Sequence, residues 1–113
     1  MRKIASVLFI AVLLTVSANG AYIYSATQRS DSVGVRLTAP ENGLLLLGVY
    51  DRYTHQMKDV TLRETGAVPD TRTLTVSLNR VPLSTEYVTA FLLDKETFAP
   101  LCVGVLADFV IPS

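Results

Sequence analysis

The sequence holds few side chains of the kinds that perform catalysis: one histidine, His55, and one cysteine, Cys102, among 113 residues. His55 stands in the polar segment 51–56, which is typical of a hairpin loop. A nucleophilic triad would need this histidine beside a serine or cysteine with an orienting carboxylate, and no Gly-x-Ser-x-Gly motif is present. Cys102 lies in an apolar stretch and is expected to be a buried thiol in a strand, with an intermolecular disulfide as the alternative. These residues predict a protein that is not an enzyme.

Carboxylates would cleave glycosides or bind calcium only as a close set. Asp51 and Asp94 each follow an apolar stretch, where a carboxylate accepts backbone N–H groups in a turn. Neither Asp51 with Asp94 nor Asp59 with Glu64 has a spacing that indicates a shared cleft. No D-x-D-x-D spacing occurs, and one histidine with one cysteine cannot build a structural zinc site. We therefore expect no metal and no cofactor.

Tyrosines are the remaining candidates for ligand contact, because the sequence has no tryptophan. Tyr22 and Tyr24 precede the expected domain, and Tyr50 and Tyr53 flank its first long turn. Of these, Tyr53 is the residue most expected to be exposed. A tyrosine at a strand end more often covers the core with its ring and leaves its hydroxyl in water. A carbohydrate ligand is therefore a weaker alternative than a protein partner.

Residues 1–18 have the three-part layout of a secretory signal peptide. Arg2 and Lys3 form a cationic start, an apolar run covers 4–16, and small residues lead to Ala18. We predict cleavage after Ala18, with Gly20 and Ala21 as alternative sites, and hence a secreted or cell-surface protein. The alternative is an uncleaved single-pass anchor, which needs about 20 apolar residues to span a membrane, whereas this run has 13.

Beyond this leader, short stretches of strand character alternate with turn residues, and no helical stripe is sustained. This pattern predicts one all-β domain over 33–113, an antiparallel immunoglobulin-like β-sandwich of six to seven strands. Residues 19–32 are expected to be a tail or an edge strand. The stretches 56–63 and 71–78 are expected to line the core with their apolar faces. The expected strands are 33–38, 44–50, 56–63, 71–78, 87–93 and 101–106, with 109–111 as an extension of the last.

The stretch 87–93 is apolar at every position but one. If Val88, Ala90 and Leu92 face the core, the other side is apolar as well. Such a strand is either covered by more protein or presents a contact patch. We predict a surface for a protein partner or for self-association. The residues expected to form it are Tyr87, Phe91, Leu93 and Tyr53.

The charge balance excludes one class of partner. Ten basic and ten acidic side chains give a formal net charge of zero. A nucleic-acid groove needs clustered lysines and arginines, so we expect no nucleic acid. Contact with a membrane is expected only if the leader stays uncleaved.

Two parts of the chain carry a resemblance. LLLGVYD at 45–51 with MKDV at 57–60, and YVTAFLLD at 87–94 with FAPLC at 98–102, are similar to small immunoglobulin- or fibronectin-III-like β-sandwich modules. Those modules are appended to secreted bacterial polysaccharide-processing and cell-surface proteins, and they often carry "ALYD … VKAFLWD … PL".

The resemblance covers roughly residues 33–103, most of the chain beyond the leader, and departs at two positions: Leu93 stands where the pattern has Trp, and Thr89 where it has Lys. It implies an accessory, non-catalytic role and supplies no catalytic residue. The sequence as a whole thus predicts an exported interaction module at the cell surface or outside the cell. The alternatives are a membrane-tethered structural subunit with an uncleaved N-terminal helix and, more distantly, a secreted hydrolase.

Overall fold

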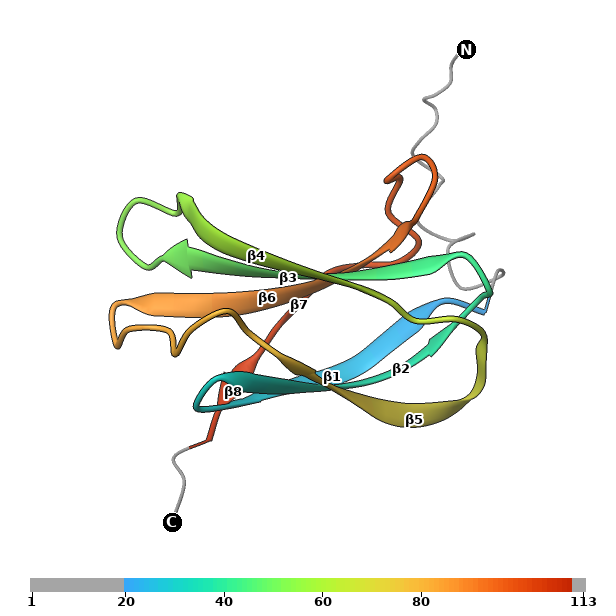
Figure 1. The fold of residues 1–113 in the computed structure, drawn as a ribbon, viewed down its shortest axis with the longest axis horizontal. Coiled ribbons are helices and arrows are strands. Elements are labelled where there is room, and N and C mark those ends of the chain that lie inside the picture. Colours follow the sequence, from blue (N-terminus) through green and yellow to red (C-terminus); the bar gives the residue numbers. More distant parts are fainter. Residues whose placement is uncertain (1–19, 111–113) are drawn as a thin grey trace.

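The computed structural model describes residues 20–110, which form eight strands in two facing sheets (Figure 1). The signal-peptide prediction for residues 1–18 therefore lies outside the described residues. Within residues 20–110 the chain has no helix capable of crossing a membrane. The strands are β1 (Tyr22–Arg29), β2 (Ser32–Ala39), β3 (Gly43–Asp51), β4 (Met57–Glu64), β5 (Val68–Ser77), β6 (Glu86–Asp94), β7 (Val105–Leu106) and β8 (Asp108–Phe109).

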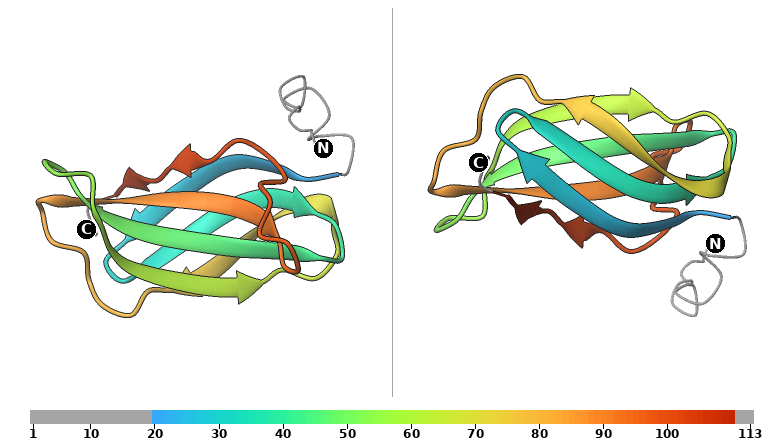
Figure 2. Two further views of the ribbon diagram at one scale, coloured as in Figure 1. Left: turned by 90° about the horizontal axis from the view of Figure 1, so that it is seen from above. Right: turned by 90° about the horizontal axis from the view of Figure 1, so that it is seen from below.

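One sheet has the strand order β5-β2-β1-β8 and the other β4-β3-β6-β7. All neighbouring strands are antiparallel except β1 and β8, which are parallel. Figure 2 shows β4, β3 and β6 side by side in its left panel and β5, β2 and β1 in its right panel. The prediction of an all-β, antiparallel sandwich is confirmed. The described residues contain six long strands and two strands of two residues each. The expected strand 101–106 is mostly a connection, and only its last two residues form β7.

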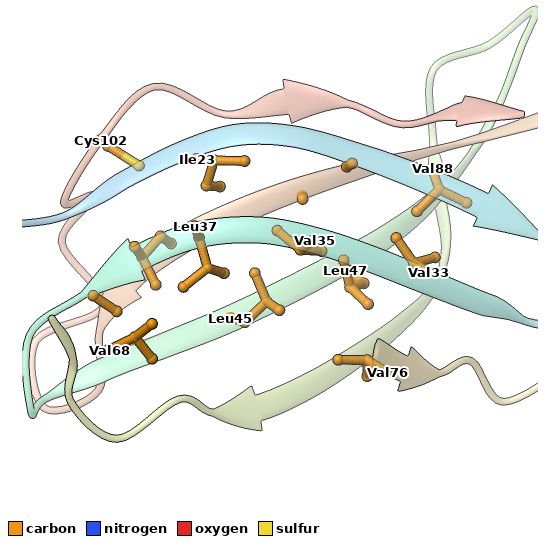
Figure 3. Packing of buried hydrophobic residues seen from close by; sticks show 14 of the residues in the cluster. Ile23, Val33, Val35, Leu37, Leu45, Leu47, Val68, Val76, Val88 and Cys102 are labelled. Atoms are coloured by element: carbon orange, nitrogen blue, oxygen red, sulfur yellow. The ribbon is translucent and has the colours of Figure 1, made fainter. Parts of the chain in front are cut away.

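The core lies between the sheets and is built from strands with a period of two. In β2, Val33, Val35 and Leu37 are fully buried, while the residues between them point away from the other sheet. From the facing sheet, Leu45 and Leu47 of β3 pack into the same cluster (Figure 3). Burial of these aliphatic side chains is the main force holding the two layers together.

Residues 19–32 are more than a tail or an edge strand. Tyr22–Arg29 form β1, which pairs with β2 along most of its length and with β8 on its other side. Ile23 and Ala26 of β1 belong to the core cluster. The described sandwich thus includes β1, ahead of the boundary expected at residue 33. The polar residues of this segment hid its period, and a bulge between Ile23 and Ser25 shifts that period by one residue.

The expectation that 56–63 lines the core is wrong. β4 is an edge strand in which Met57, Val60 and Leu62 are all exposed. Its register sets Thr61 opposite Leu47 and Val60 opposite Gly48, so the apolar side chains lie on the outside of the sheet. A period of two shows that a strand has an apolar face, but only the pairing register decides which way that face points.

The free edge of β4 is closed at its middle by side chains. Both outward-pointing backbone groups of Val60 are occupied: its N–H donates to Oδ1 of Asp59 at 2.9 Å, and its carbonyl accepts from Nδ2 of Asn79 at 3.2 Å. The same Asn79 amide also donates to Oδ1 of Asp59 at 3.0 Å. Another strand therefore finds no free donor or acceptor at this position.

Candidate interaction surface

Strand β6 is apolar on both of its faces, as its sequence predicts. Val88, Ala90 and Leu92 are buried between the sheets, each with an exposed fraction of 1% or less. The alternate residues Tyr87, Phe91 and Leu93 lie on the outside and are partly exposed. The described strands form two layers, so no further strand covers this outer side of β6 (Figure 1).

The neighbouring strands continue this surface in cross-strand rows. One row joins Leu62 of β4, Leu46 of β3 and Phe91 of β6, and the next joins Val60, Gly48 and Thr89. Leu106 of β7 extends the second row beyond Thr89, and Leu44 lies beside Leu93. We call this surface the apolar outer face. It comprises Leu44, Leu46, Gly48, Tyr50, Val60, Leu62, Tyr87, Thr89, Phe91, Leu93 and Leu106.

Two glycines allow aromatic rings to lie close against the backbone at this surface. A Cβ atom at Gly48 would come within 2.7 Å of the Tyr50 ring, and one at Gly104 within 2.6 Å of the Phe91 ring. The Tyr50 ring also stacks on that of Tyr87, with centroids 5.4 Å apart and planes 15° apart. Rings packed in this way have little rotational freedom left to lose if the surface becomes buried.

Tyr53 lies apart from these rows. It follows the end of β3 in the turn to β4, where 76% of it is exposed. Its backbone N–H donates to Oδ1 of Asp51 at 2.8 Å. This hydrogen bond stabilises the turn but does not fix the position of the Tyr53 ring. Of the four predicted contact residues, the strand β6 brings Tyr87, Phe91 and Leu93 to one side, whereas Tyr53 lies outside the rows of this face.

The residues considered for chemistry are dispersed. Asp51 and Asp94 end antiparallel neighbours, so they stand at opposite ends of the sheet, about 27 Å apart at about 3.3 Å per residue. Asp59 and Glu64 share strand β4 but project to opposite sides. His55 pairs only with a tyrosine: its Nδ1 lies 3.1 Å from the hydroxyl of Tyr87. Within residues 20–110, no group of three metal-binding side chains comes together.

The two aspartates serve the turns, as their sequence positions predict. Oδ1 of Asp51 accepts from the N–H groups of Tyr53 and Thr54, and Oδ1 of Asp94 accepts from those of Glu96 and Thr97. These backbone hydrogen bonds stabilise the charged form and hold the pKa of each carboxyl below its ordinary value.

Cys102 is 8% exposed and packs in the core cluster. Burial raises the pKa of its thiol, partly offset by a hydrogen bond with the backbone of Ile23. The prediction of a buried thiol is confirmed, but the residue lies in the connection between β6 and β7 rather than in a strand. A protonated, enclosed thiol is a poor nucleophile.

A pocket of about 470 Å³ lies at the end of the sandwich where β6 begins. Its polar wall includes Glu86, whose side chain is 5% exposed and pairs with Arg80 through two hydrogen bonds of 2.7 and 2.9 Å. Oε1 of Glu86 also accepts from the N–H of Leu83 at 2.8 Å. The sequence pattern has no signal for this network, because Arg80 and Leu83 lie in the loop before β6. The carboxylate is fully engaged in holding that loop.

No family model matches the sequence, and no curated protein matches it either.

Proposed function

We propose that this protein is an exported, non-catalytic interaction module that associates with a second copy of itself through the apolar outer face. The observation that supports this role most directly is the contrast between the two outer surfaces. The surface of the β5-β2-β1 sheet carries mainly Ser, Thr and Arg side chains, with Tyr22 and Tyr24 at the start of β1, whereas that of the β4-β3-β6 sheet carries Leu, Val, Phe and Tyr. A contiguous exposed apolar patch on a small domain is typical of an interface.

The size of the surface fits a weak, reversible dimer. Three to four strands about 4.8 Å apart and about eight residues long cover roughly 400 to 500 Å². Two copies face to face would bury on the order of 1,000 Å², near the lower limit for a specific protein–protein interface.

The charge distribution favours a second copy as the occupant. In a two-fold contact each patch meets itself, so any charge at its centre would face an equal charge. The outward residues of β3 and β6 on this face carry no charge at all. The charged Glu64 and Lys95 lie at its border, joined by an exposed ion pair of 3.4 Å. Two such faces meet without like-charge repulsion.

We also propose that the protein is not catalytic. His55, Cys102 and the carboxylates are far apart or engaged in turns, so the described residues offer no nucleophile with a base. The sequence resemblance to accessory modules of secreted proteins agrees with a binding role.

Export is testable by mass. If residues 1–18 are a cleaved signal peptide, protein recovered from outside the cytoplasm is expected to begin at Asn19. Intact-mass spectrometry measures this directly. The control is the Ala18→Leu variant, in which cleavage after residue 18 is expected to be blocked. A mature protein that retains Arg2 and Lys3 would contradict cleavage and support the tethered alternative.

Self-association is tested with the double variant Val60→Lys/Leu62→Lys. Both side chains are exposed on the edge strand β4, so the fold is expected to survive, while two added charges per copy would face those of the partner. Light scattering of the purified protein over a concentration series is expected to show a monomer–dimer equilibrium for the natural sequence and a monomer for the variant.

The matched control is Val81→Lys/Leu83→Lys, which changes two exposed apolar residues of the loop before β6, outside the apolar outer face. It is expected to dimerise like the natural sequence. A natural protein that stays monomeric at the highest soluble concentration, or a control that loses the dimer equally, would overturn the proposal.

A further inference from the structure

The outer surface of the other sheet is hollowed along its middle. Cross-strand rows of β1, β2 and β5 line a depression of about 310 Å³. One row joins Ser25, Arg36 and Thr73, and the next joins Thr27, Gly34 and Thr75. We call this depression the hydroxyl trough. The strands β1, β2 and β5 that carry it lie side by side in the right panel of Figure 2.

Gly34 forms the floor of the trough. Its backbone is not in the left-handed region, so the chain conformation does not require glycine. A Cβ atom there would meet Cγ2 of Thr73 at 3.3 Å, which a small shift relieves. Glycine inside a strand weakens it and often marks a place where a ligand approaches the backbone. Here it leaves a gap between the side chains of Thr27 and Thr75.

The trough is positively charged. Arg36 and Arg29 both line it, and no carboxylate does. Neither guanidinium forms an ion pair with another residue in 20–110. The two arginines stand on neighbouring strands four residues apart in register, which places their Cα atoms about 14 Å from each other. An elongated anionic ligand could contact both, with the hydroxyls between them.

Aromatic rings extend the trough at its Arg36 end. The Arg36 guanidinium carbon lies 5.9 Å from the centroid of the Tyr24 ring, and the rings of Tyr24 and Tyr22 contact edge to face at 4.6 Å. Both tyrosines are about half exposed. Exposed rings provide apolar faces with a hydroxyl handle.

We propose that the hydroxyl trough binds an anionic polysaccharide. Arg29 and Arg36 would pair with its carboxylate or sulfate groups, the threonine and serine hydroxyls would bond its hydroxyls, and Tyr22 and Tyr24 would stack on a ring. A nucleic acid would require a denser set of cations than two arginines. A membrane surface would require exposed aliphatic side chains, whereas the trough between the arginines is lined by hydroxyls.

This site does not depend on the apolar outer face, since the two lie on opposite surfaces of the sandwich (Figure 1). If both operate, a dimer would present two troughs facing away from each other. One dimer would then join two polysaccharide chains.

The test uses the purified mature protein with polygalacturonate as the anionic probe and dextran as the neutral one, compared by affinity electrophoresis. Retardation by polygalacturonate, weakened by salt, and none by dextran is the expected result. Arg29→Gln/Arg36→Gln is expected to lower the affinity by about tenfold or more for each arginine, because each loses a charge-assisted hydrogen bond. Gly34→Val fills the floor with a residue suited to strands and should abolish binding while the protein stays folded.

The control for net charge is Lys58→Gln/Lys95→Gln, which removes two cations elsewhere and is expected to leave binding unchanged. Equal loss in this control would show general attraction and overturn the proposal. So would the absence of any retardation by polygalacturonate, or retardation as strong by duplex DNA or by vesicles of anionic lipid. Self-association measured on the same variants stays intact if only the trough is affected, which separates this proposal from the preceding one.

Discussion

Truncation of Leu47 to alanine is expected to lower the free energy of unfolding by about 3 kcal/mol, within the usual range for buried leucine. Leu47 is fully buried in β3, the strand paired along its length with both β4 and β6. Its removal leaves a cavity between the two sheets that rigid strands cannot close. For a domain whose total stability is typically about 5 to 15 kcal/mol, this is a large share. Denaturant unfolding monitored by tyrosine fluorescence measures the change.

The matched control is Leu62→Ala on β4. The same chemical change is made at a residue that is 54% exposed, so the expected loss is below about 1 kcal/mol. A loss as large as that of Leu47→Ala would mean that the apolar outer face is part of the folding core, and the proposed interface would lose its basis. A small loss shows that Leu62 is not needed for folding.

Replacement of Glu86 by glutamine is expected to cost about 1.5 kcal/mol at neutral pH, the low end for hydrogen bonds to a charged group. The variant keeps an oxygen for the N–H of Leu83 but loses the charge that pairs with Arg80. The low figure reflects the Arg80 side chain, which is 39% exposed and so screened by water. Thermal unfolding of the two proteins at pH 7 measures the difference.

The effect of Glu86→Gln is expected to depend on pH. Hydrogen bonds from Arg80 and Leu83 hold the pKa of Glu86 below its ordinary value. A carboxyl whose pKa is lower in the folded state stabilises the fold above its unfolded pKa of about 4.3, and this contribution is lost as the pH falls through the folded pKa. The gap between the two proteins should therefore shrink below pH 4. Glu64→Gln, at the exposed Lys95 pair, is the control and should show no measurable change at either pH. A gap that stays constant down to pH 3 would contradict a role for the charge.

The strands that the sequence predicts best are those whose period is unbroken. The alternating pattern of 33–38 corresponds to β2. The apolar run 44–50 corresponds to β3, which is covered on one face and half-covered on the other and is therefore apolar on both. The alternation along β6 also indicates which residues point inward. Val88, Ala90 and Leu92 are all aliphatic, whereas the alternate positions include the larger aromatic side chains of Tyr87 and Phe91.

Features that depend on pairing were not predictable. The direction of the apolar face of β4 follows from its register with β3, and the place of β1 follows from a bulge that shifts its period. The hydroxyl trough depends on three strands that bring Thr27, Gly34 and Thr75 into one row, although they are far apart in the chain. Single residues of this kind look like ordinary strand positions until the sheet is formed.

The contacts of Asn79 and Asp59 with Val60 have a consequence for how large an assembly can grow. A sandwich with an apolar surface beside an open strand edge would be prone to polymerise strand by strand into fibrils. With both outward backbone groups of Val60 occupied, a strand of another copy cannot form its hydrogen bonds at the middle of the β4 edge. Asn79 therefore hinders strand-by-strand growth of the sheet at β4.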